Sequence, residues 1–255
     1  MARRVTAVVT PILFAVAFLT LWELFVVVRH VKPFLLPKPS AIWGELVGSR
    51  TQEVKVTRVT GLNALVGLVF GTAAGVVVAF VASRFRLLGE LVTPLAIAVS
   101  TIPIIVLVSV FNNMFATTSE VPRRLMVTIV VFFVVFVNVN RGLTQTSATQ
   151  LELMRSYAAN DWAVLRKVRA PNALPFFFTA LKVAAPLAVV TAFVSEYFGG
   201  NQNGLGNRIT SSIANSKDAA GWAYVACACV LGLAFYLASL VFERLAMPWQ
   251  ARRSN

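Results

Sequence analysis

The stretch LNALVGLVFGTAAGVVVAFV, at residues Leu62–Val81, contains no charged side chain. As an α-helix it is about as long as the hydrocarbon core of a bilayer is thick. Its apolar residues cover every face of such a helix instead of one stripe, so there is no side that would face water. The stretch therefore predicts a transmembrane helix.

The rest of the chain repeats this pattern. Hydrophobic residues make up 58% of the sequence and charged residues 13%, whereas a soluble domain carries roughly a quarter charged residues. The other apolar blocks of spanning length are Val5–Val28, Leu91–Phe111, Leu125–Val139, Phe176–Phe198 and Trp222–Phe242. We expect an all-α integral membrane protein with about six transmembrane helices.

The amino-terminal region has two interpretations. Arg3 and Arg4 precede an apolar stretch, and Ala15–Val16–Ala17 resembles the cleavage site of a secretory signal. The apolar run continues to Val28, however, so we expect an uncleaved first span. After a proline-rich connection, Ser40–Arg58 mixes apolar and charged residues as a helix at the membrane interface does. We therefore divide the chain into residues 1–60 (first span and interfacial segment), 61–248 (transmembrane core) and 249–255 (cytoplasmic tail).

The formal charge of +13 does not indicate nucleic-acid binding. The basic residues are spread over the segments between apolar blocks, without a basic stripe or interleaved aromatic residues. They fit basic loops flanking membrane spans. The loop from Arg141 to Pro175 has five basic residues and the loop from Gly199 to Gly221 has two, which predicts that the former is cytoplasmic. With six spans, both termini are then cytoplasmic.

Small residues recur at every fourth position of the second span, at Gly67, Gly71 and Gly75. They place a groove along one face of the helix. Helices in lipid associate through close packing of such small residues, because no hydrophobic effect drives them together. We expect this groove to hold a neighbouring helix.

The loop at about residues 141–175 is longer than most helix connections and has a helical composition. Asn160–Asp161 offers a break and an N-cap for a second short helix. A loop of this length in the cytoplasm is expected to fold and to dock on something.

This loop resembles the signature of the inner-membrane permeases of binding-protein-dependent ABC importers. That signature is Glu-Ala-Ala, three residues, Gly, nine residues, Ile, one residue and Leu-Pro. The same spacing is present here in Glu152, Leu153 and Met154, then Ala158, then Val168, then Ala170 and Pro171. Ala158 replaces the glycine, and Leu153 and Met154 replace the alanines.

Further segments resemble the branch of this family that transports sulfonates, taurine, nitrate or vitamin precursors. They are Leu36–Ser40, Thr101–Ile104, Asn172–Pro175, Ser195–Glu196 and Gly204–Gly206. The segment Asn112–Glu120 departs from that branch, which has an aromatic residue and a glycine there.

The resemblance implies a permease subunit in a bacterial inner membrane that forms the pathway for a small solute. Its implied partners are an ATPase dimer, a second permease subunit, identical or different, and an extracytoplasmic solute-binding protein. The resemblance implies that Glu152, Leu153, Met154, Ala158, Val168, Ala170 and Pro171 form coupling helices that contact the ATPase.

The sequence itself indicates no enzyme. It has no phosphate-binding Gly-x-x-x-x-Gly-Lys-Ser/Thr loop, so ATP and Mg²⁺ are expected on the separate ATPase and no cofactor on this chain. His30 is the only histidine, and no nucleophile has a base at a recognisable spacing. Cys227 and Cys229 lie in an apolar run without acidic or histidine companions and indicate neither a metal site nor a disulfide.

Ionisable residues inside spans are the remaining candidates, because a charge in lipid is costly. Lys182 and Glu196 are about four turns apart, so both point to the same side of the fifth span, and Pro186 lies one turn from Lys182. These three residues could line a pathway. Alternatively, Lys182 could extend its ammonium group to the cytoplasmic interface, as Glu23 could extend its carboxylate to the outer one.

A secondary transporter or channel driven by an ion gradient is the alternative function. It would need paired acidic residues along a relay inside the membrane, and Glu23 and Glu196 are the only acids available.

Overall fold

The computed structural model describes residues 2–85, 90–92, 94, 98, 101–116, 118–199 and 201–248. All regular structure in these ranges is helical, as the sequence predicts. Four helical stretches are long and apolar enough to cross a membrane: α3 (Arg50–Arg84), α6 (Val121–Thr144), the continuous run Asp161–Tyr197, and α11 (Asp218–Ala246). The run Asp161–Tyr197 comprises α8 (Asp161–Val164), the π-helix η1 (Leu165–Arg169) and α9 (Ala170–Tyr197).

The other two predicted spans are described less completely. The first lies within α1 (Ala2–Val28). The third, Leu91–Phe111, falls partly outside the described residues, and its described end belongs to α5 (Ile104–Met114). The predicted tail, residues 249–255, also lies outside them.

The predicted interfacial helix differs from the observed one. Instead of one helix from Ser40 to Arg58, α2 (Pro39–Gly48) ends at Gly48, Ser49 forms a turn, and α3 begins at Arg50. At 35 residues, α3 is roughly 50 Å long, which exceeds the hydrocarbon core by several turns. Its charged first turns therefore extend beyond the apolar region without interrupting the helix.

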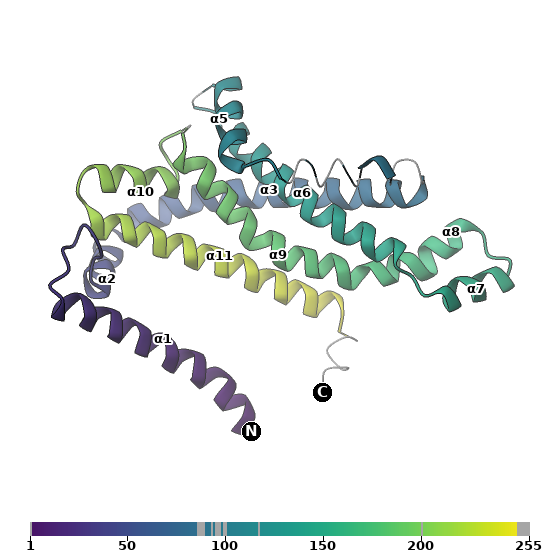
Figure 1. The fold of residues 1–255 in the computed structure, drawn as a ribbon, viewed down its shortest axis with the longest axis horizontal. Coiled ribbons are helices and arrows are strands. Elements are labelled where there is room, and N and C mark those ends of the chain that lie inside the picture. Colours follow the sequence, from purple (N-terminus) through teal and green to yellow (C-terminus); the bar gives the residue numbers. More distant parts are fainter. Residues whose placement is uncertain are drawn as a thin grey trace.

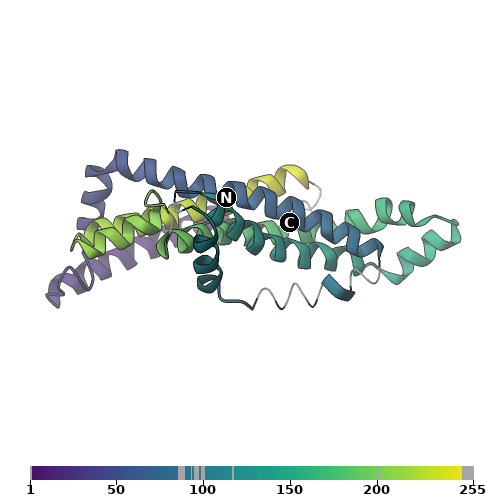
Figure 2. The ribbon, with the colours of Figure 1, turned by 90° about the horizontal axis from the view of Figure 1, so that it is seen from above.

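The core of the molecule is formed by α3, α6 and α9. In Figure 1, α6 lies alongside both α3 and α9, and α11 packs on α9 from the other side. Figure 2 shows the same elongated bundle from above. The buried contact positions are mostly small or β-branched, such as Ala64, Val131, Val135, Ala184 and Ala188, which lets the helix axes approach closely.

The two ends of the bundle carry different elements. The short helices α7 (Ala148–Ser156) and α8 project from one end, and α2 and α10 (Leu205–Ala214) lie at the other (Figure 1). We call the end that carries α2 and α10 the outer end, because it lies opposite the α7–α8 loop, which the sequence predicts to be cytoplasmic. The helix α1 runs toward that outer end and α11 runs away from it.

Two contacts join the last turns of α1 to the rest of the chain. The rings of Trp22 and Trp222 are 5.6 Å apart between centroids. The hydroxyl of Ser40 donates a 2.8 Å hydrogen bond to the Glu23 carboxylate. Glu23 is therefore hydrogen-bonded to the segment that follows its own helix, which accounts for its place in an apolar span.

Candidate functional site

The turn after α7 contains a left-handed residue at the position of the family glycine. Ala158 has φ +49°. The N–H of Ala158 donates to the carbonyl of Arg155, and the N–H of Ala159 donates to that of Met154. These two bonds form a Schellman motif, in which the left-handed residue is usually glycine because a Cβ is disfavoured there. The left-handed backbone explains why the family has glycine at this position. In this chain alanine adopts the same conformation at a cost in strain.

The helix α8 starts where the sequence predicts a break. The Asn160 side chain accepts a 2.8 Å hydrogen bond from the N–H of Ala163 and caps the helix. The prediction of an N-cap at Asn160 is confirmed.

Two contacts fasten the loop to the bundle. Arg84, the last residue of α3, pairs with Asp161 at 2.5 Å between Nη1 and Oδ2. The Asn172 amide donates to the carbonyls of Gly142 and Gln145 at 2.8 and 2.9 Å, and so joins the start of α9 to the end of α6. Between these contacts η1 forms a π-helical turn, a feature that often marks functional positions.

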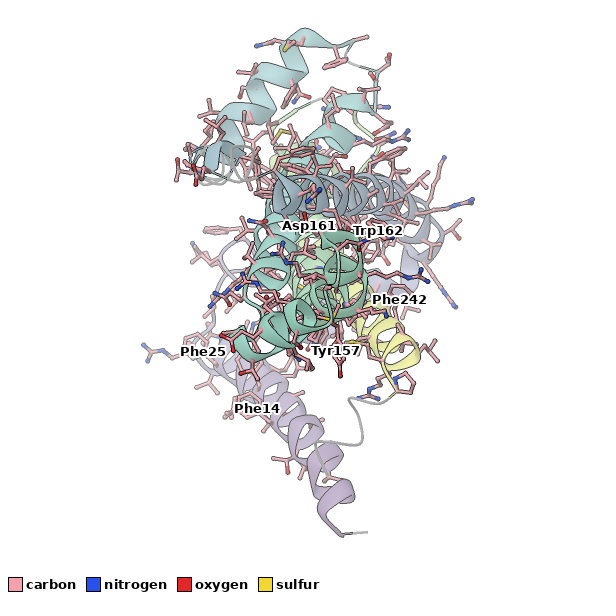
Figure 3. All side chains as sticks on the ribbon, turned by 90° about the vertical axis from the view of Figure 1, so that its right-hand side faces the viewer. Phe14, Phe25, Tyr157, Asp161, Trp162 and Phe242 are labelled. Carbon is pink, nitrogen blue, oxygen red and sulfur yellow. The ribbon has the colours of Figure 1, made fainter. Side chains whose placement is uncertain are left out.

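Apolar side chains are exposed on the α7–α8 loop. Within the described part of the chain, no residue of α7 or α8 is buried. Leu153, Tyr157 and Trp162 are 54%, 74% and 68% exposed. Figure 3 looks onto this end, where Tyr157, Asp161 and Trp162 lie nearest the viewer.

The other signature residues lie in two places. Glu152 is exposed on α7, whereas Val168, Ala170 and Pro171 belong to η1 and the first turn of α9. The signature residues therefore form an exposed part and a part continuous with the bundle.

The glycine groove of α3 faces α6. Gly67, Gly71 and Gly75 are all buried. A Cβ built on Gly71 would lie 2.6 Å from the Thr128 carbonyl oxygen and 2.8 Å from Val131 Cβ. The groove thus brings the two helix backbones into near contact.

A cluster of buried polar side chains joins the outer ends of four helices. We call it the outer polar cluster, and it consists of Thr60, Asn63, Glu120, Arg123, Glu196, Asn201, Asn203 and Asn207. Arg123 and Glu196 are 1% and 0% exposed. The Arg123 guanidinium donates to Glu120 at 2.8 Å and to Asn203 at 2.7 Å, and its Nη1 lies 3.9 Å from Glu196 Oε1.

Glu196 is held from three other directions. Its Oε2 accepts hydrogen bonds from the Thr60 hydroxyl at 2.8 Å and from the Gly206 N–H at 3.2 Å. Its backbone carbonyl accepts one from the Asn207 amide. In this conformation the carboxylate joins α3, α9 and α10 and faces no open space.

Glu120, just before α6, is the acidic partner outside the spans. Burial raises the pKa of its carboxyl group, but the amides of Asn203 and Asn63 and the charge of Arg123 outweigh this and lower the pKa below its ordinary value. The carboxylate is therefore ionised next to Arg123 at neutral pH.

The sequence identifies Glu196 but not Thr60, Glu120, Arg123 or the four asparagines of the cluster. By sequence Arg123 is one of many basic residues between apolar blocks, although in the fold it is the largest fully buried side chain in the described residues. Glu120 belongs to the segment that departs from the sulfonate branch, and that departure was the available signal.

Lys182 and Glu196 do not meet. Lys182 Nζ lies 2.8 Å from Glu243 Oε1 on α11, with both side chains partly buried. Lys182 is thus paired across a helix interface, an arrangement that neither the pathway nor the interfacial interpretation included. α9 continues through Pro186 without a break in the helix.

Replacement of Lys182 with methionine is expected to destabilise the α9–α11 contact by about 1–3 kcal/mol, because it leaves the Glu243 carboxylate unpaired. The double variant Lys182→Met/Glu243→Gln should regain most of the lost stability. Thermal unfolding in detergent measures both. An unchanged unfolding temperature for Lys182→Met would show that the pair contributes nothing.

Comparison with known proteins identifies the family of this chain. Residues 67–248 match the model of the family described as binding-protein-dependent transport system inner membrane component. The chain belongs to this family. It is an ABC importer permease, and the secondary-transporter alternative is set aside.

Two named permeases are similar along most of their length. The formylaminopyrimidine transport permease ThiX of Halalkalibacterium halodurans is 27% identical over 256 residues, covering 98% of this chain and 100% of that protein. The riboflavin transport system permease RibX of Chloroflexus aurantiacus is 26% identical over 239 residues, covering 91% and 87%.

Solved ABC transporter structures share the fold. A chain of an amino acid ABC transporter with histidines has a TM-score of 0.65 at 14% identity, with 78% of this chain and 96% of that chain covered. A chain of the MetNI methionine transporter in an inward-facing conformation has a TM-score of 0.55 at 19% identity, with 79% and 95% covered.

Proposed function

We propose that this permease forms half of a solute pathway in a bacterial inner membrane and is driven by a separate ATPase dimer through the α7–α8 loop. The observation that carries the proposal is the exposed loop itself, with the left-handed Ala158 turn at the family spacing. ATP and Mg²⁺ act on the ATPase subunits. A second permease, identical or different, completes the pathway.

Exposed apolar side chains support an ATPase contact. Leu153, Tyr157 and Trp162 are exposed on the α7–α8 loop, which projects from the end of the bundle that we assign to the cytoplasm. Exposed clusters of aromatic side chains are typical of protein interfaces, where burial contributes about 25 cal/mol per Å². The Arg84–Asp161 pair and the Asn172 bonds link this surface to α3, α6 and α9, so movement of the loop reaches the core helices.

The relatives favour a vitamin-precursor solute over a sulfonate, taurine or nitrate. The names of both relatives specify planar heterocycles, a formylaminopyrimidine and riboflavin. An extracytoplasmic binding protein delivers the solute to the outer side of the permease.

Replacement of Ala158 with glutamate is expected to abolish ATPase association. A charged side chain would be placed in the contact, and a buried unpaired carboxylate costs several kcal/mol. Co-purification of the ATPase with the permease and hydrolysis stimulated by the binding protein in liposomes measure the effect.

Ala158→Gly is the matched control. Glycine relieves the strain of the left-handed turn by about 1 kcal/mol and adds no bulk, so association should persist. If Ala158→Glu retained both ATPase association and stimulated hydrolysis, the coupling surface would lie elsewhere.

A further inference from the structure

A groove of about 870 Å³ runs between α3 and α11. The residues that line it on α3 recur at every third or fourth position, so they form one stripe along the helix. The first half of this stripe carries the charged side chains Arg50, Glu53 and Arg58, and the second half consists of Gly61, Leu62 and Leu65. The lining from α11 carries no charge. The groove therefore has a charged head and an apolar tail.

The charged head lies at the membrane interface. Both α3 and α11 start at the outer end and run away from it (Figure 1). Gly61 lies beside Leu231, because a Cβ built on Gly61 would be 3.3 Å from Leu231 Cδ1. Eight residues earlier on the two helices are Glu53 and Ala223, and Ala223 adjoins Trp222, where the apolar block of α11 begins. Glu53 is thus level with the edge of the hydrocarbon core, and the tail of the groove extends into it.

Glu53 is a buried carboxylate without a cation. It is 5% exposed and lines the groove. Arg50 precedes it by one turn on the same stripe, yet within the described part of the chain neither side chain makes a hydrogen bond or an ion pair. A buried carboxylate without partners is costly, and a primary ammonium group supplies both an opposite charge and N–H donors. Glu53 therefore favours an ammonium group in the head of the groove.

Arg50 supplies the opposite charge next to Glu53. Its side chain is exposed at the same end of the groove. Residues three positions apart on a helix are neighbours, with about 5–6 Å between their Cβ atoms. A guanidinium group binds phosphate oxygens through paired N–H donors. The head of the groove can therefore bind a phosphate and an ammonium group side by side, as they occur in phosphoethanolamine.

The tail of the groove fits a hydrocarbon chain. Its apolar side chains at Leu62, Leu65 and Val230 are between 48% and 68% exposed. A second apolar hollow of about 220 Å³ shares Leu65 and Phe235 with the groove and continues it along α11. In a bilayer such a surface contacts acyl chains, and a groove contacts one chain from two sides and so gains more dispersion contacts. One acyl chain can therefore lie along the tail while its headgroup stays at the interface.

We propose that this groove binds phosphatidylethanolamine, with the ammonium group at Glu53, the phosphate at Arg50 and an acyl chain along the tail. The order of charged and apolar parts along the groove matches the order of groups in this lipid. A choline headgroup has no N–H donor and a glycerol headgroup has no cation, so each satisfies Glu53 less well. The proposal requires neither the ATPase nor the solute-binding protein.

The test compares how much of two phospholipids the purified permease retains. The permease is reconstituted with equal amounts of phosphatidylethanolamine and phosphatidylcholine that have identical acyl chains. It is then extracted in a mild detergent, and the bound lipids are counted by native mass spectrometry. The wild-type permease should retain phosphatidylethanolamine over phosphatidylcholine by at least about fivefold, because only ethanolamine donates charged N–H bonds to the Glu53 carboxylate. Glu53→Gln should bring this ratio to within about twofold of unity, because an amide carries no charge.

Arg50→Gln tests the phosphate contact. It should lower the retention of both lipids by about threefold or more without changing their ratio, because both carry the same phosphate. Lys55→Gln is the matched control, since Lys55 is exposed on the same part of α3 and does not line the groove. This variant loses the same charge and should retain both lipids as the wild type does.

Three results would overturn the proposal. The first is equal retention of the two lipids by the wild-type permease, and the second is a wild-type ratio in Glu53→Gln. The third comes from Ala234→Trp, which places a bulky side chain in the tail of the groove and should reduce the phosphatidylethanolamine retained. If Ala234→Trp instead separated permease oligomers in size-exclusion chromatography and left the retained lipid unchanged, the groove would be an interface between copies of the chain.

Discussion

Replacement of Arg123 with alanine is expected to lower the stability of the permease by about 3–5 kcal/mol, which corresponds to a fall in unfolding temperature on the order of 10 °C. The guanidinium is buried between Glu120 and Glu196 and also donates to Asn203 and to the carbonyl of Asn201. Its removal leaves the buried Glu196 carboxylate without a cation. Thermal unfolding in detergent, followed by size-exclusion chromatography, measures the loss.

Two further variants separate this effect from a general loss of positive charge. Arg58→Ala removes an exposed cation near the same end of α3 and should leave the unfolding temperature unchanged within about 1 °C. Arg123→Ala combined with Glu196→Gln should lose less than Arg123→Ala alone, because the uncompensated charge is then absent. If Arg123→Ala unfolded at the wild-type temperature, the outer polar cluster would contribute nothing to stability.

Replacement of Gly71 with leucine is expected to prevent assembly of the bundle. Even a Cβ at this position would come within 2.6 Å of a backbone oxygen of α6 and 2.8 Å of Val131 Cβ. Backbone atoms cannot move aside as a flexible side chain can, so the helices must separate. The separation also removes the packing of Val127, Val131 and Val135. The yield of monodisperse permease in detergent measures the loss, which we expect to be at least tenfold.

Gly232→Leu is the matched control in α11. A Cβ at Gly232 meets no described atom within 4 Å, so leucine has room there. The same glycine-to-leucine change in an apolar helix should then leave the yield near the wild-type value. Normal yield and oligomeric size for Gly71→Leu would mean that the groove does not govern assembly.

Much of the architecture is predictable from local sequence. A run of about 20 apolar residues without polar alternation crosses lipid as a helix, because a helix satisfies its own backbone hydrogen bonds and barrel strands are shorter and alternate. The sequence therefore predicts α3, α6, α9 and α11 and the all-α class. The glycine spacing predicts a close helix contact because side-chain size directly limits how near two backbones can come. The cap at Asn160 is also predictable, because it is a local interaction. Its acceptor, the Asn160 side chain, and its donor, the Ala163 N–H, are only three residues apart.

Which residues meet across the bundle was decided by tertiary structure. Helical periodicity places Glu196 and Lys182 on the same side of α9, where they could line a pathway, but it names no partner for either residue. In the fold Glu196 bonds to Thr60, 136 positions away, and Lys182 pairs with Glu243, 61 positions away. By sequence Arg123 is one of many basic residues between apolar blocks, and only the fold places Glu120, Asn203 and Asn207 around it. Periodicity specifies the direction of a side chain on its own helix. The identity of its partner depends on how separate helices pack, and a charge inside a membrane protein takes whichever partner that packing brings within reach.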